Sequence, residues 1–184
     1  MSPSSTGCQR PASALGFSES IRNQACQLFR SAQNEDLLRG RSIEAIAAGS
    51  VYGTCRCNGL GRTVEEIAAL ARVNQQPVMN AYKLLNQEPG LHTQPIRPSG
   101  FGPRLASELG VSDQLRHLVQ RLAEHSEAVD KTVGVRPSGF AAACLSGASQ
   151  ECGQPLTQRS AADAANVTPT TVRAHRDTIE GLSI

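Results

Sequence analysis

Apolar positions along the chain recur at the spacing of helices, and no segment shows the alternation typical of a strand. In the first half the pattern predicts helices at about 18–33, 42–58 and 63–71, and a fourth after Asn74 that includes Val78 and Leu85. In the second half it predicts helices at about 101–109, 112–127, 137–152, 157–165 and 168–180. The chain is therefore predicted to be all-α.

Capping residues mark several of these helix ends. Ser18 and Ser112 are N-cap candidates, and Thr63 with Glu66 has the spacing of a capping box. Gly59 fits the position after a helix C-terminus. Thr168 precedes Pro169, which is favourable at the first helical position because proline has no N–H to leave unpaired there.

The chain also contains an internal repeat. Shifted by 94 residues, positions 41–85 align with 135–179 without a gap, with nine identities. The aligned residues include helix caps, glycines at helix ends and apolar core positions, as two copies of one helical unit require. The identities are Ala47/Ala141, Ala48/Ala142, Gly53/Gly147, Gly59/Gly153, Thr63/Thr157, Ala68/Ala162, Ala71/Ala165, Val73/Val167 and Val78/Val172.

The repeat and a segment rich in proline and glycine define the predicted domains. Residues 1–13 are predicted to be disordered, 14–88 to form the first repeat, 89–97 to be a linker, and 98–184 to form the second repeat.

Composition narrows the function classes. Aromatic residues make up 3% of the chain and the net charge is +2, so nucleic-acid contact must come from placed residues rather than a basic field. The six cysteines form no CxxC pair and the four histidines lack ligand spacing, so we expect no structural zinc and no other cofactor. No constellation typical of an enzyme appears. Since no signal peptide or membrane-spanning run is visible, we expect a cytoplasmic protein with reduced thiols. The internal repeat suggests a pseudo-symmetric monomer.

Each repeat contains a helix-turn-helix pattern, and in the second copy it spans residues 156–173. Val167 and Val172 are its apolar anchors. The N-terminal part of the second helix is the part that enters a major groove, so Thr170 and Arg173 are candidate DNA contacts. The alternative is a helical hairpin that only packs, with Arg173 in solvent.

The first copy differs in its outward residues. Pro77 lies in the first turn of its second helix, and Met79 aligns with Arg173. This copy is expected to be structural, with protein contact as its other use.

At this point the chain resembles the core of transcription initiation factor IIB, especially its archaeal form. The likeness runs from about residue 12 to 182 and is carried by five stretches: 14–20 (ALGFSES), 34–48 (NEDLLRGRSIEAIAA), 62–68 (RTVEEIA), 103–110 (PRLASELG), and 136–143 (RPSGFAAA) together with 157–159 (TQR) and 167–173 (VTPTTVR).

The resemblance implies two cyclin-like repeats of five helices that bind the TATA-binding protein on promoter DNA and recruit RNA polymerase. It places reading of the element upstream of the TATA box on the second helix-turn-helix, at Thr168, Thr170, Thr171 and Arg173. It also implies that Arg39 and Arg41 contact phosphate or a partner. The alternative is a protein-binding cyclin-fold scaffold that does not bind DNA.

The chain departs from the family pattern at its N-terminus. We expect no zinc ribbon before the repeats, because Cys8 stands alone, and we expect most of the first helix of the first repeat to be missing, so that this repeat is truncated. The chain is then either a diverged regulator or a remnant of a full-length factor. Ser146 and Gly147 also stand where a larger apolar pair is usual.

Overall fold

The computed structural model describes residues 16–87, 91–154 and 156–180, and in these ranges every regular element is a helix. The chain divides into two compact units, Met1–Pro95 and Ile96–Ile184. The predicted all-α class with two helical repeats is confirmed. The predicted disorder of residues 1–13 falls outside the described residues.

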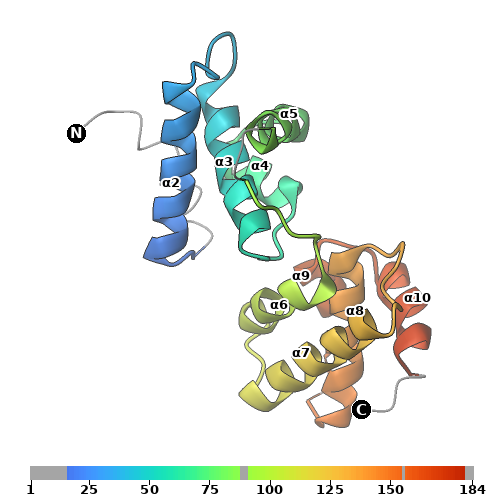
Figure 1. Cartoon of the computed structure of the whole chain (residues 1–184). Coiled ribbons are helices and arrows are strands. Elements are labelled where there is room, and N and C mark those ends of the chain that lie inside the picture. The colour runs from blue at the N-terminus through green and yellow to red at the C-terminus, as the bar shows by residue number, and fades with distance from the viewer. Residues whose placement is uncertain (1–15, 88–90, 155, 181–184) are drawn as a thin grey trace. The chain divides into compact units, whose positions relative to one another are not determined.

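The first unit is built around one small-residue helix (Figure 1). Its helices are α2 (Glu19–Asn34), α3 (Ile43–Cys57), α4 (Val64–Ala71) and α5 (Gln75–Asn86). The whole stretch from Ala45 to Cys55 in α3 is buried, and α2, α4 and α5 all pack against this helix. Alanine, glycine and serine dominate α3, which lets its neighbours approach from several sides.

The second unit has the same plan, with α8 at its centre. A short 3₁₀ turn, η2 (Pro98–Gly100), precedes α6 (Gly102–Glu108), α7 (Asp113–Ala128), α8 (Pro137–Glu151), α9 (Gln158–Ala164) and α10 (Pro169–Glu180). Phe140 and Leu145 of α8 are fully buried, and Leu115, Val119 and Val172 close around them from α7 and α10. The described helices include none that is both long and apolar enough to cross a membrane.

The 94-residue offset also relates the helix bounds of the two units, including α2 and α7, which lie outside the aligned segments 41–85 and 135–179. The offset carries α2 onto α7, α3 onto α8 and α5 onto α10 with identical bounds, and α4 onto α9 with one residue's difference. The predicted N-caps are also confirmed. Ser18 accepts from the Ile21 N–H at 3.5 Å, and its counterpart Ser112 accepts from the Leu115 N–H at 3.3 Å.

Left-handed backbone positions follow the same offset. In the described residues ten positions have positive φ, and they form five pairs: Gly16/Gly110, Asp36/Asp130, Gly40/Gly134, Gly59/Gly153 and Arg72/Asn166. A left-handed conformation costs an ordinary L-residue roughly 1–2 kcal/mol, so it persists only where the surrounding fold requires it. The pairing therefore shows that the turns, and not only the helices, are repeated.

The segment before Gly16 bears on the expected truncation. At the same offset Arg10, Ala12 and Ser13 align with identical residues of α6, and Leu15 and Gly16 match Leu109 and Gly110. Residues 1–15 lie outside the described part of the chain, so the expectation of a missing first helix stays a prediction.

Candidate nucleic-acid interface

The helix-turn-helix of the second unit is assembled by small buried residues. Ala161, Ala162 and Ala165 of α9 and the turn are fully buried, as is Val172 of α10. The turn passes through Asn166, at φ +51°, and the Val167 N–H donates to the Ala162 carbonyl at 2.9 Å. These residues fix the direction in which α10 begins.

Two of the four predicted DNA contacts are engaged in capping that helix. The Thr168 hydroxyl accepts from the Thr171 N–H at 3.3 Å, and the two hydroxyl oxygens lie 3.0 Å apart. Thr168 is exposed and Thr171 is half-buried. Because both hydroxyls already have partners, they are better suited to holding the start of α10 than to reading a base.

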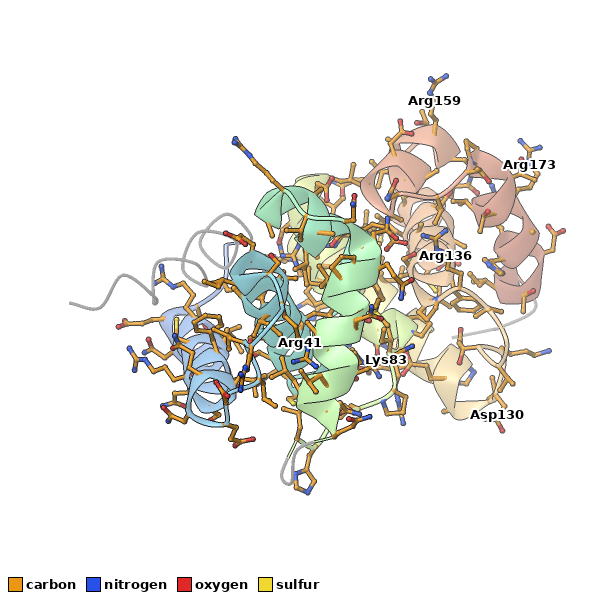
Figure 2. The ribbon with its side chains drawn as sticks, turned by 90° about the horizontal axis from the view of Figure 1, so that it is seen from above. Arg41, Lys83, Asp130, Arg136, Arg159 and Arg173 are labelled. Atoms are coloured by element: carbon orange, nitrogen blue, oxygen red, sulfur yellow. The ribbon has the colours of Figure 1, made fainter. Side chains whose placement is uncertain are left out.

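The other two predicted contacts face solvent. Thr170 and Arg173 are exposed, while Val172 between them is fully buried. Figure 2 shows Arg173 extending outward from α10. Its guanidinium makes no hydrogen bond or ion pair with the residues that the structure describes, so its donors are available to an acceptor.

Sequence reasoning missed Arg159, a second cation on the same motif. It lies on α9 with 86% of its side chain exposed, and its guanidinium is 4.0 Å from the Asp163 carboxylate, a weak surface pair. Figure 2 shows it projecting from α9 into solvent. The signal that could have found it is its place on the exposed side of the first helix of the motif, in the Thr157-Gln158-Arg159 stretch.

The counterpart in the first unit has the same frame but different chemistry. Arg72 at φ +56° makes its turn, and Val78 is its buried anchor. Glu65 takes the place of Arg159, and Met79 that of Arg173. This element therefore lacks the two outward cations of the second copy.

The loop between α2 and α3 holds the predicted Arg39 and Arg41. Arg41 folds back on this loop, where its Nη1 donates to the Leu37 carbonyl at 3.0 Å and to the Arg39 carbonyl at 3.4 Å. Both arginines are nevertheless exposed. Arg41 thus stabilises the loop while leaving the rest of its guanidinium available, and Arg39 stands in solvent beside it.

Three of the five cysteines in the described residues are buried, while Cys57 and Cys152 are half-buried. Cys26, Cys55 and Cys144 are buried, and burial raises the pKa of the Cys55 and Cys144 thiols to about 12. The thiols of Cys55 and Cys144 are therefore neutral at ordinary pH. Within the part of the chain that the structure describes, no three His, Cys, Asp or Glu side chains come together as metal ligands would.

Comparison with known proteins agrees with this architecture. The sequence model of the transcription factor TFIIB repeat matches the chain twice, at residues 3–88 and 91–179. Transcription initiation factor IIB 5 of Halobacterium salinarum is 54% identical over 172 residues, covering 94% of this chain and 56% of that protein. Transcription initiation factor IIB 1 of the same organism is 42% identical over 169 residues, covering 92% and 59%.

A more distant relative gives the same picture. Transcription initiation factor IIB of Archaeoglobus fulgidus is 37% identical over 176 residues, covering 95% of this chain and 54% of its own length. The chain thus spans little more than half the length of the curated relatives it matches.

Proposed function

The chain belongs to the transcription factor IIB family, and from this premise we propose that it acts in transcription initiation by binding the TATA-binding protein and promoter DNA as the preinitiation complex assembles. RNA polymerase is the further partner that this role implies. The relatives' names state a role in transcription initiation, and the partners are those that the family resemblance implies.

One observation carries the DNA-binding part of the proposal. Arg173 stands exposed one residue after the buried anchor Val172, on the helix of a helix-turn-helix motif that enters a major groove. A guanidinium binds O6 and N7 of guanine in a bidentate manner, and the Thr170 methyl can contact a thymine methyl. Thr168 and Thr171 contribute to the proposed interface by capping the start of this helix.

Phosphate contacts complete the proposed interface. Arg159 on α9 and the loop arginines Arg39 and Arg41 are exposed cations suited to phosphate oxygens, which add affinity without sequence preference. Arg39 and Arg41 also suit an acidic surface of a protein partner.

The test is a gel shift on an archaeal promoter duplex, with and without a TATA-binding protein. We expect the wild-type chain to bind the promoter duplex better than one whose upstream flank is scrambled. Arg173→Ala should remove about 1–3 kcal/mol of that discrimination, while Met79→Ala at the equivalent place in the first unit should leave it unchanged.

An alternative function has one observation in its favour. At the places of the exposed Arg159 and Arg173, the first helix-turn-helix has the half-buried Glu65 and Met79, with Met79 packed against the core, so it offers DNA no outward cation there. If the wild-type chain binds the TATA-binding protein but does not shift the promoter duplex in the gel, the chain is a protein-binding scaffold that does not bind DNA.

A further inference from the structure

Gly139 of the central helix leaves no room for a side chain beside the first turn of the last helix. A methyl group placed on Gly139 of α8 would lie 2.8 Å from Cγ2 of Thr171, far inside the usual carbon–carbon separation of about 3.5–4.0 Å. Near the other end of α8, a methyl group on Gly147 would meet only Cγ2 of Ile179, at 4.0 Å. The tight contact is therefore confined to the start of α10.

In the first unit the tight contact lies one helical turn later. A methyl group on Gly49 of α3 would lie 2.7 Å from Cβ of Ala81, the seventh residue of α5. Thr171 is the third residue of α10. The two glycines are not equivalent, because the 94-residue offset pairs Gly139 with Ala45. The second unit thus holds its last helix at the turn that carries Thr170 and Arg173.

Thr171 has little freedom to move away from Gly139. Its hydroxyl lies 3.0 Å from that of Thr168, and its N–H donates to the same Thr168 oxygen at 3.3 Å. Rotating χ1 to turn the methyl away from Gly139 would also move the Thr171 hydroxyl and break its contact with the Thr168 hydroxyl. A side chain at position 139 must therefore displace the start of α10 or break this hydroxyl–hydroxyl contact.

We infer that Gly139 is a positioning residue for DNA reading: by having no side chain, it lets the first turn of α10 lie against α8, and so sets where Thr170 and Arg173 meet the base edges. This inference rests on the proposed function. A small displacement at this turn moves both outward residues together, because they are on the same rigid helix as Thr171.

The experiment compares Gly139→Ala with Gly147→Ala, a control on the same helix that faces the same neighbour. Both changes replace glycine by a better helix former, which favours α8 by up to about 1 kcal/mol. The measurement is the ratio of dissociation constants for an archaeal promoter duplex with a scrambled and with a native upstream flank, in the presence of a TATA-binding protein. Far-UV circular dichroism checks that each variant is helical.

We expect Gly139→Ala to lower this ratio about tenfold, within the range that one bidentate arginine–guanine contact provides. Gly147→Ala should keep the wild-type ratio. Thr171→Ser removes the methyl that position 139 would meet while keeping the hydroxyl that contacts Thr168, so Gly139→Ala combined with Thr171→Ser should recover the ratio of Thr171→Ser alone.

Three results would overturn the inference: a wild-type ratio in Gly139→Ala, an equal loss in Gly147→Ala, or no recovery in the double variant. If Gly139→Ala does not fold, the double variant decides, since an unfolded double variant would show that the Thr171 methyl is not the obstacle. Failure of the proposed function is distinguishable, because it appears in the wild-type chain as a ratio of one, and the inference then falls with it.

Discussion

The helix-turn-helix of the second unit and its counterpart in the first share a backbone and differ in what they present to solvent. Both have a left-handed residue in the turn, Asn166 and Arg72, and both have a buried valine in the second helix. The outward residues Arg159 and Arg173 of the second unit correspond to Glu65 and Met79 of the first. The frame is thus kept by turn and core residues, while the surface is free to change.

The loop that precedes each central helix differs between the units at the positions of the predicted loop arginines. Arg39 and Arg41 of the first unit correspond to Val133 and Val135 of the second, and Val133 is 76% exposed. These two positions are thus cationic only in the first unit, although Lys131 and Arg136 place exposed cations elsewhere on the loop of the second unit.

The largest expected effect concerns the cores, where the comparison predicts equivalence. Phe140 of α8 and Ile46 of α3 are equivalent in position and both are fully buried. Phe140→Ala should lower the free energy of unfolding by about 3–5 kcal/mol, and Ile46→Ala by about 2–5 kcal/mol. Urea denaturation followed by circular dichroism measures both. A loss under about 1 kcal/mol at either position would show that the two central helices do not stabilise their units equally.

The second prediction transfers the charge of one motif to the other. Glu65→Arg with Met79→Arg gives the first helix-turn-helix the cations of the second. If that face lies near DNA, two added phosphate contacts should make the slope of log affinity against log salt more negative, by up to about 1.8. Glu65→Gln with Met79→Gln is the matched control. An unchanged slope would place this face away from DNA whatever its charge.

A smaller effect is expected at the helix caps that begin the two motifs. Thr63 accepts from the Glu66 N–H at 3.2 Å, and its equivalent Thr157 accepts from the Ser160 N–H at 3.0 Å. Thr63→Ala and Thr157→Ala should each cost about 1 kcal/mol of stability. Thermal unfolding of the two variants tests this, and Thr→Ser replacements should retain the wild-type value. A clear difference between the two losses would mean that the caps contribute unequally to their units.

The smallest effect is a pH dependence that belongs to the second unit alone. Burial against Phe140, whose ring centroid lies 5.7 Å from that of His175, lowers the pKa of His175 below its ordinary 6.5. The unfolded chain then binds a proton more readily than the folded one, so this histidine destabilises the fold as pH falls below about 6.5 and has no effect well above it. The first unit has Ala81 at this position.

The measurement is the unfolding free energy of wild type and His175→Ala between about pH 7.5 and pH 5. Stability should fall less steeply with decreasing pH in His175→Ala, because the variant lacks this proton-binding difference. Parallel curves for the two proteins would contradict the assignment.

The sequence determined the helices, their caps and the repeat, because these depend on local chemistry. Ser18, Ser112 and the Thr63–Glu66 box cap helices as predicted, and the predicted offset holds. Sequence identity alone does not show that α2 and α7 are equivalent, because at this offset they share only Arg22/Arg116 and Leu28/Leu122. Their solvent-facing residues have diverged, while apolar spacing and caps keep their bounds equal.

Only the tertiary structure decided which residues of the motif are available and what sets their place. Sequence grouped Thr168, Thr170, Thr171 and Arg173 as candidates, whereas the structure engages the first and third in a cap and leaves the other two outward. The close contact of Gly139 with Thr171 joins residues 32 positions apart. Such a contact depends on the distance between the packed helices α8 and α10. The local chemistry that sets caps and turns does not specify this distance.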